Sequence, residues 1–492
     1  MRKEILEIFS KQNIASLKNE FSEEEIPKLR YGMIHSSFGK VDGVSIVMKQ
    51  LEGVLHNQLK VPLKNIRYLV GKSDIKSRHI TENIFLWNKH EDNVLMLKNY
   101  SSGYGGGSSE RIELAISSAK EAIERWIKKN KIDILIAHNT SHPENFVGSV
   151  ALSRYYRDSI LSGKKTPKYI LWWHDSHLER EFYLHPAHDV GNYLLQGVPG
   201  SFVEYVIFIN SLQFKEAKKY FKKLTEHQPD FYKNVRLHHN VIYNTTDTFI
   251  DSFNDLEKGR FNDRVDIFMA DFKVKELLNK NKVSLSDTFF VLQHTRMVER
   301  KRIDFALKYS YELFTEMKKK NMAKAFYFFI SGHSYADGTK EKLVKLNKEF
   351  QKEYNTKKFF LVFAEDFYER TKLSFEDYPK IFAELGAIST YFSDVEGFGN
   401  NLLEVLASGL IPAIYKYPVY KKDIAKYKFR AINFSSYEIP KSKIRETLEF
   451  VKNKKKRMDA VNHNLEILKK NFSHNIMASE LKRAITSKRT HI

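Results

Sequence analysis

The sequence predicts an α/β protein built from two doubly wound domains with parallel sheets. Short apolar runs alternate with longer charged amphipathic stretches, and this rhythm occurs twice along the 492 residues. Apolar strands separated by helices are typical of parallel sheets covered by helices on both faces. A chain of this length can bury a large core without disulfides. It has no cysteine, which excludes a cysteine nucleophile, a zinc finger and a cysteine-ligated cluster.

The first series of elements covers the N-terminal half of the chain. Apolar runs predict strands at 31–35, 133–137, 168–173 and 205–209. Amphipathic stretches predict helices at about 45–56 and 110–130. The domain boundary is expected at 241–247, because polar turn residues follow a short strand there.

The second series begins after residue 285. Strands are predicted at 289–292, 325–330 and 359–363. Helices are predicted at 301–319 and 340–354, with two more between about 442 and 488. Two successive series of this kind indicate two doubly wound sheets.

The charge of the chain indicates an anionic ligand. Lys and Arg number 81 against 60 Asp and Glu, a net charge of +21. This surplus attracts nucleotides, phosphorylated substrates, acidic lipid surfaces or nucleic acid. Aromatic residues gather in strand-like runs and do not alternate with Lys and Arg, which argues against nucleic acid.

The apolar runs of the sequence are short. None approaches the roughly 18 residues of a membrane span. Residues 1–21 lack the apolar centre of a signal peptide and predict a helix. We therefore expect a cytoplasmic protein, with peripheral attachment at the inner membrane face as the alternative.

A glycine-containing turn is the most informative segment. Gly397 and Gly399 flank Phe398, and we expect Asn400 and Asn401 to cap the helix that follows. Gly409 is expected to end that helix in a left-handed conformation. Backbone amides at such a turn, together with the helix dipole, favour a bound phosphate.

Two carboxylates flank this turn. Glu396 and Glu404 are separated by seven residues, one on each side of the phosphate site. Carboxylates accept hydrogen bonds from hydroxyls, so the pattern suits a polyol that carries phosphate, such as a nucleotide sugar. A capped core helix with two solvated acids remains the alternative.

Two cations follow the strand predicted at 289–292. Arg296 and Lys301 lie at the carboxyl edge of the sheet, where α/β domains bind ligands. A guanidinium fork and an ammonium point charge can together clamp a diphosphate. The alternative is a basic loop that faces solvent.

These two segments together resemble the retaining glycosyltransferases of family four, also called glycosyl transferases group 1. The resemblance implies the GT-B fold, in which two Rossmann-like domains face a cleft and the C-terminal helix crosses back to the N-terminal domain. It predicts an acceptor-side domain at 1–245, a nucleotide-sugar-binding domain at 246–472, and the returning helix at 473–492. Residues 244–247 resemble the family's linker between domains.

The resemblance also implies roles for the motif residues. Glu404 would hold the ribose hydroxyls, Glu396 would contact the transferred sugar, and Arg296 with Lys301 would neutralise the diphosphate. Arg302 stands where the family often has glycine. The full donor-binding set would be Gly43, Arg296, Lys301, Glu396, Gly397, Phe398, Gly399, Asn400, Asn401, Leu402 and Glu404.

In the N-terminal half, residues 39–44 resemble the glycine loop that approaches the donor phosphates. His174 follows a strand and resembles the family's histidine near the sugar and acceptor, so it joins Glu396, Arg296 and Lys301 as a predicted catalytic residue. His138 and Asp175 are predicted on the acceptor side. A structural histidine bonded to Asp175 is the alternative for His174.

The predicted function is that of a retaining hexosyltransferase. It would move a hexose from a nucleotide-diphosphate sugar to a hydroxyl of a sugar, glycan, lipid or small polyol. We expect no cofactor and no metal, because Arg296 and Lys301 would replace the metal in charge neutralisation. UDP-sugar is expected first, with GDP- or ADP-sugar as alternatives, and the oligomeric state is left open. The competing functions are a GT-B disaccharide phosphorylase and a basic protein that binds nucleic acid or an anionic surface.

Overall fold

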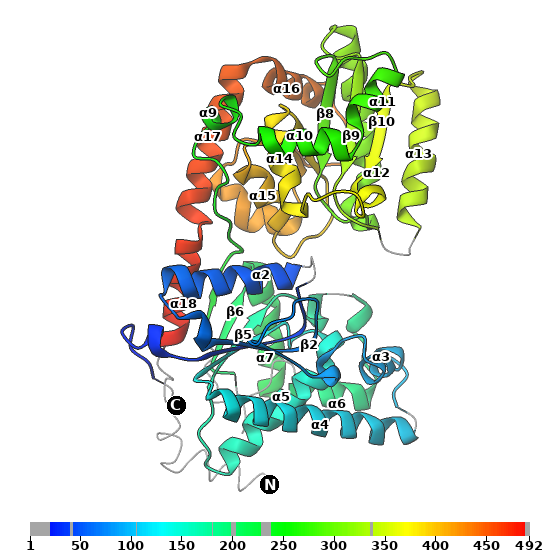
Figure 1. Cartoon of the computed structure of the whole chain (residues 1–492). Coiled ribbons are helices and arrows are strands. Elements are labelled where there is room, and N and C mark those ends of the chain that lie inside the picture. Colours follow the sequence, from blue (N-terminus) through cyan, green and yellow to red (C-terminus); the bar gives the residue numbers. More distant parts are fainter. Residues whose placement is uncertain are drawn as a thin grey trace. The chain divides into compact units, whose positions relative to one another are not determined.

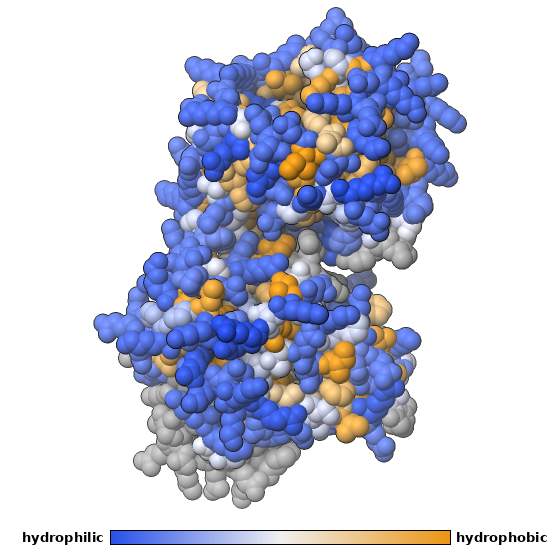
Figure 2. Space-filling view, viewed as in Figure 1, coloured by the Kyte–Doolittle hydropathy of each residue, from blue (hydrophilic) through white to orange (hydrophobic). Residues whose placement is uncertain are grey.

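The computed structural model describes residues 20–39, 43–104, 106–179, 181–197, 203–227, 238–334 and 338–487. The chain divides into two compact units. Unit 1 contains Met1–Asn244 with His474–Ile492, and unit 2 contains Thr245–Ser473. Each unit has one sheet with helices around it (Figure 1). Hydrophilic residues cover most of the face shown in Figure 2.

Unit 1 contains a seven-stranded parallel sheet with the strand order β3-β2-β1-β4-β5-β6-β7. The strands predicted from apolar runs coincide with β1, β4, β5 and β6. Strand β7 is the short strand expected before the domain boundary, whereas β2 and β3 were not predicted, because they carry polar or charged residues among the apolar ones. The bounds are β1 (Tyr31–Phe38), β2 (Ile66–Ser73), β3 (Ile80–Glu82), β4 (Ile134–His138), β5 (Lys168–Trp173), β6 (Tyr205–Phe208) and β7 (His238–Val241).

Helices cover both faces of this sheet. In Figure 1, α4, α5 and α6 lie along one face, and α2 and α18 lie along the other. The predicted helices at 45–56 and 110–130 correspond to α2 and α4. The bounds are α2 (Gly43–Gly53), α3 (Glu91–Lys98), α4 (Gly106–Asn130), α5 (Phe146–Leu161), α6 (His188–Gly197), α7 (Ser211–His227) and α18 (His474–Thr486).

The C-terminal helix α18 packs on unit 1, as the fold prediction requires. Lys168, at the start of β5, is buried and its Nζ donates to the carbonyl oxygens of Ile485 and Ser487, each at 2.7 Å. The last carbonyls of a helix have no intrahelical donor, so a cation placed there satisfies them and complements the helix dipole. One buried lysine therefore ties the end of the chain to the sheet.

Unit 2 contains a six-stranded parallel sheet in the order β10-β9-β8-β11-β12-β13. The three predicted strands coincide with β8, β9 and β10. The bounds are β8 (Thr288–Gln293), β9 (Ala325–Ile330), β10 (Phe359–Phe363), β11 (Ile388–Tyr391), β12 (Ile411–Tyr415) and β13 (Ile432–Phe434).

Consecutive aromatic residues of β9 pack on both faces of this sheet. Phe329 packs edge-on against Phe268 of α10, with ring centroids 5.2 Å apart. Phe326, three residues earlier in the same strand, packs on Phe314 of α12 with ring centroids 5.5 Å apart. Successive side chains of a strand point to opposite faces, so α10 and α12 cover opposite faces. The first helices are α9 (Phe253–Glu257), α10 (Asn262–Asp271), α11 (Val274–Lys280), α12 (Ile303–Lys319), α13 (Thr339–Glu353) and α14 (Tyr378–Glu384).

The later helices of unit 2 are α15 (Asn400–Ala407), α16 (Lys441–Lys452) and α17 (Lys454–Asn471). The prediction of two helices over 442–488 is wrong, because α16, α17 and α18 occupy that stretch. Asn453 separates the first two, and its side chain accepts a hydrogen bond from the Lys456 amide at 2.9 Å. A new N-cap therefore starts a second helix where the amphipathic pattern runs on.

The division between the units falls after Asn244 and again after Ser473. Near these points the Thr246 amide donates to the Phe472 carbonyl oxygen at 2.8 Å. The helix predicted over 1–21 falls on residues 1–19, outside the described part of the chain. None of the helices in the described part combines the length and apolar character that crossing a bilayer demands.

Substituting Lys168→Met tests the attachment of α18. Hydrogen bonds from a charged donor contribute about 1.5–3 kcal/mol. We expect the free energy of opening of α18 to fall by about 2 kcal/mol, which accelerates amide hydrogen exchange in this helix roughly 30-fold. The exposed Lys164→Met serves as the matched control and should leave exchange unchanged. Equal exchange rates of α18 in both variants would contradict the role of Lys168 in holding this helix.

Candidate active site

A buried ion pair lies where β8 leads into α12. The ammonium of Lys301 donates to Glu396 Oε1, and both residues are buried. Arg300 Nη1 donates to the other carboxylate oxygen, Oε2, at 3.3 Å and to the Val395 carbonyl oxygen at 2.5 Å. The sequence assigned Lys301 and Glu396 to different parts of the ligand. The structure brings them into direct contact and adds Arg300, which the sequence did not single out.

The charges of this pair follow from its surroundings. Burial alone would raise the pKa of Glu396, but the cations Lys301 and Arg300 lower it to about 2. Burial lowers the pKa of Lys301 to about 8, and the attraction of Glu396 opposes this shift. Both groups are therefore charged at neutral pH.

Arg296 adds a further positive charge at this edge. It is half-buried just beyond the end of β8. Burial is the main cause of the lowered pKa values of Lys301 and His333, and the charge of Arg296 lowers both further. Lys301 and Arg300 therefore contact the carboxylate, and Arg296 adds positive charge near Lys301, an arrangement suited to an anionic ligand.

Arg302, where the family often has glycine, has left-handed backbone with a φ of +48°. Glycine adopts this conformation readily, whereas other residues do so at a cost. The guanidinium is held by both carboxylate oxygens of Asp304, at 3.2 and 3.1 Å, and lies 4.1 Å from the Tyr437 ring centroid. These contacts offset the strain, so the turn keeps its shape without glycine.

The predicted glycine turn precedes α15. Gly399 has a φ of +121°, and a Cβ there would lie 2.4 Å from the hydroxyl oxygen of Tyr417. That hydroxyl donates to the Phe398 carbonyl oxygen at 2.6 Å. Two independent constraints therefore require glycine at 399. Gly409, with a φ of +87°, follows the helix end as predicted.

The expected capping of α15 by asparagine is wrong. Gly399 itself is the N-cap, and the cap has no side-chain hydrogen bond. Asn400 is the first helical residue, and Asn401 Nδ2 donates to the His294 carbonyl oxygen at 2.6 Å. Asn401 therefore joins α15 to the end of β8 and does not cap the helix.

Glu404 is held by a histidine that the sequence did not identify. His294 is fully buried, and its Nε2 lies 3.0 Å from Glu404 Oε2. Because a carboxylate only accepts, Nε2 donates to it, and Nδ1 lies 2.8 Å from Ser331 Oγ. The imidazole also stacks on Phe375 with centroids 4.1 Å apart. This arrangement fixes the carboxylate predicted to hold ribose. The only sequence signal was the position of His294 directly after a strand.

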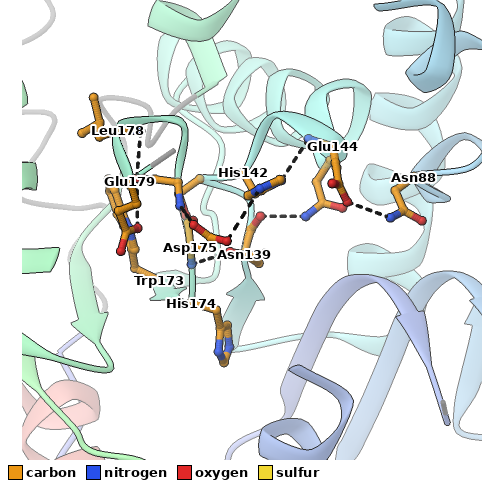
Figure 3. Close-up of polar contacts among 12 residues, drawn as sticks. Asn88, Asn139, His142, Glu144, Trp173, His174, Asp175, Leu178 and Glu179 are labelled. Carbon is orange, nitrogen blue, oxygen red and sulfur yellow. Dashed lines mark hydrogen bonds and ion pairs between the residues drawn. The ribbon is translucent and has the colours of Figure 1, made fainter. Parts of the chain in front are cut away.

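A second polar cluster lies in unit 1, at the carboxyl ends of β4 and β5 (Figure 3). Asn139 has a φ of +57°, and its Oδ1 accepts from the Asp175 amide at 2.8 Å. Ser141 Oγ donates to the Asp175 carbonyl oxygen at 2.6 Å. His142 Nε2 lies 3.8 Å from Asp175 Oδ2. These contacts hold the loop after β5 in place.

His174 does not pair with Asp175 through its side chain. Figure 3 shows the imidazole of His174 pointing away from the Asp175 carboxylate. Its Nε2 lies 3.0 Å from His138 Nδ1. His138 is 0% exposed, whereas His174 is 8% exposed. Both are buried, and of the two only His174 keeps a small exposed fraction.

Gly43, the remaining predicted donor contact, opens α2, and no atom lies within 4 Å of a Cβ placed there. The other part of its loop, Lys40 to Asp42, lies outside the described residues. The structure also contains no group of three or more metal-ligating side chains among the residues it describes.

Comparisons with known proteins address the fold and class. No family model matches the chain. Mannosylglucosylglycerate synthase from Petrotoga mobilis is 26% identical over 423 residues, which cover 83% of this chain and 87% of that protein. A glycosyltransferase from Rickettsia africae superposes with a TM-score of 0.52 at 13% identity, covering 93% of this chain and 99% of that one. An E. coli trehalose-6-phosphate structure bound with UDP-2-fluoro glucose gives a TM-score of 0.58 at 10% identity, with coverages of 93% and 99%.

The chain has the GT-B fold of glycosyltransferases. The predicted fold is therefore confirmed. The proteins to which the chain is similar transfer sugars, in agreement with the predicted enzyme class.

Glu179 is a further acid in unit 1, in the same loop as His174. Its carboxylate accepts from Trp173 Nε1 and from Ser176 Oγ, each at 3.1 Å. Burial, aided by the charge of Asp175, raises the pKa of Glu179 to about 7. The loop after β5 thus contains an acid that titrates near neutral pH.

We expect Glu179→Gln to flatten the pH dependence of stability. Between the ordinary pKa of 4.5 and about 7, the folded protein retains a proton that the unfolded chain releases. The free energy of unfolding of the native protein therefore falls as pH rises through this window. Melting temperatures at pH 4.5 to 8 measure the slope. Asp175→Asn should reduce the slope only in part, and an unchanged slope in Glu179→Gln would refute the assignment.

Proposed function

We propose that this protein is a retaining glycosyltransferase that moves a hexose from a nucleotide-diphosphate sugar to a hydroxyl acceptor without a metal. The observation that carries the proposal is the contact of Lys301 and Arg300 with Glu396, with the charge of Arg296 near Lys301, beside the N-terminus of α15. Fixed cations are what the departing diphosphate needs as negative charge develops on it. Because burial and the hydrogen bond to Glu396 orient Lys301 beforehand, this cation needs little reorganisation.

We assign the carboxylates of Glu404 and Glu396 to the two sugars of the donor, the ribose and the transferred hexose. His294 engages Glu404 Oε2, and in the part of the chain that the structure describes no hydrogen bond reaches Oε1. That oxygen is the one we assign to ribose hydroxyls. Glu396 remains ionised among its cations and therefore accepts hydrogen bonds from hydroxyls of the transferred sugar.

In unit 1, we assign His174 and Asp175 to the acceptor or the transferred sugar. His174, at the carboxyl edge of β5, keeps a small exposed fraction, and the Asp175 carboxylate is partly exposed. The Petrotoga mobilis relative is named for a product that joins mannose, glucose and glycerate. That name supports a small hydroxylated acceptor over a polymer or a lipid.

A ligand panel tests the donor assignment. Uridine, guanosine and adenosine diphosphates and their hexose derivatives are added in a thermal-shift assay. A ligand at 100 times its Kd adds about 2.7 kcal/mol of stability. Transfer to small polyols and hexosides is then followed by NMR, where a retained anomeric configuration is expected. Cleavage of disaccharides by phosphate, without nucleotide, would support a phosphorylase instead.

Replacing the cations should slow transfer without unfolding the protein. Arg296→Ala is expected to lower kcat by about 100-fold or more, because it removes stabilisation of the leaving diphosphate. Steady-state kinetics at saturating donor provide the test. The exposed Lys324→Ala, at the opposite end of β8, is the control and should retain native kcat.

The buried pair requires a balanced substitution. Lys301→Met alone leaves Glu396 ionised without its main partner, which costs about 3–5 kcal/mol. The double variant Lys301→Met/Glu396→Gln removes both charges. It should melt close to the native protein yet lose about 100-fold or more in kcat. A native kcat in this folded double variant would contradict the proposed mechanism.

Glu404→Gln should weaken donor binding more than it slows transfer. The amide cannot accept from two hydroxyls as a carboxylate does, and it no longer pairs with His294 as a charged acceptor. We expect the donor Kd, measured by titration calorimetry, to rise about tenfold, with a smaller change in kcat. A fall in kcat with unchanged Kd would contradict the assignment to ribose.

A further inference from the structure

We propose that His138 is a positioning residue that fixes the proton of His174 on Nδ1, so that His174 offers substrate a hydrogen-bond donor and not an acceptor. The consequence for transfer rests on the proposed function. The position of the proton itself is a property of unit 1 that can be measured without any substrate.

The two imidazoles form one hydrogen-bonded unit. His138 Nδ1 and His174 Nε2 are 3.0 Å apart, and the ring centroids are 5.3 Å apart. Burial, followed by the charges of His174 and His35, holds the pKa of His138 well below its usual value. Burial, followed by His35, lowers the pKa of His174 to about 3. Both rings are therefore neutral at working pH, and each carries one proton.

With one proton on each ring, only two arrangements satisfy the bond between them. Either His138 donates from Nδ1 to His174 Nε2, or His174 donates from Nε2 to His138 Nδ1. In the second arrangement, His138 would carry its proton on Nε2. That atom is buried and finds no hydrogen-bond partner among the described residues.

The first arrangement has the lower cost. In proteins, a buried N–H without an acceptor is rarer than a buried acceptor without a donor. Placing the proton of His138 on Nδ1 leaves only an unpaired acceptor at Nε2. His174 Nε2 then accepts, so the proton of His174 must lie on Nδ1.

Neighbouring groups hold His138 in this orientation. Its ring stacks on Trp172 with centroids 5.6 Å apart and an interplanar angle of 17°. Its own carbonyl oxygen accepts from His35 Nδ1 at 3.0 Å. Because a carbonyl only accepts, His35 must carry a proton on Nδ1. His138 is thus fixed from both its ring and its backbone.

The arrangement determines what His174 can do. Its Nε2 lone pair is occupied by His138, so the ring cannot accept a proton from a substrate hydroxyl at that atom. Its Nδ1–H can donate to a hydroxyl oxygen of the sugar or acceptor. His174 therefore orients substrate and does not act as a general base. The sequence placed His138 beside the acceptor, whereas its burial favours a role through His174.

Nitrogen-15 NMR of histidine-labelled, deuterated protein reads the tautomer directly. The His174 signals are identified by their loss in His174→Asn. We expect Nδ1 of His174 to carry the proton in the native protein without ligand. Observation of the proton on Nε2 would overturn the proposal, whatever the protein transfers.

Two variants of His138 separate hydrogen bonding from shape. Asn places an amide N–H near the position of Nδ1 but leaves a void, whereas Phe fills the space and lacks a donor. We expect His138→Asn to keep the His174 tautomer and to retain kcat within about tenfold. His138→Phe should shift the proton toward Nε2 and lower kcat more than tenfold, at unchanged Kd for nucleoside diphosphate.

The opposite ranking, or an unchanged tautomer in His138→Phe, would show that His138 only fills the core. Melting temperatures of both variants identify any loss of folding, and the spectra are compared only for folded protein. If the tautomer is as expected but no nucleotide sugar supports transfer, the proposed function fails and the assignment of the proton stands.

Discussion

The candidate site depends on the burial of Glu396 among cations. A carboxylate removed from water is costly unless opposite charges compensate it, and Lys301 and Arg300 do so here. The pair fixes the turn before α15 against the loop after β8, where Arg296 adds a further positive charge. Strand ends, the glycine turn and the excess positive charge thus follow from one electrostatic requirement. The same requirement explains why the site suits a diphosphate.

In unit 1, the buried polar side chains His138 and His174 are oriented by neutral groups. Its polar residues after β4 and β5 lie at the carboxyl edge of a sheet whose interior is apolar. Burial keeps His138 and His174 uncharged, so hydrogen bonds and not ion pairs determine their orientation. Ion pairs therefore orient the cluster around Glu396, whereas hydrogen bonds between neutral rings orient His138 and His174.

Much of the fold could be predicted from the sequence, because β5, β9 and β10 are continuous apolar runs. Strand β11 could not, since Ile388–Tyr391 reads as a short polar segment although Ser389 is buried and donates to the Leu292 carbonyl oxygen. The glycine turn was predictable from local chemistry. The contacts of Glu396 and of His294 were not, because the partners lie about a hundred residues apart and only the sheet order brings them together.

The most direct test compares a nucleoside diphosphate with the matching monophosphate by titration calorimetry. If the cations at the end of β8 grip a pyrophosphate, the diphosphate should bind at least tenfold more tightly, about 1.4 kcal/mol, and Arg296→Ala should narrow that difference. Equal affinity of the two nucleotides, or a preference that survives the loss of Arg296, would contradict the account.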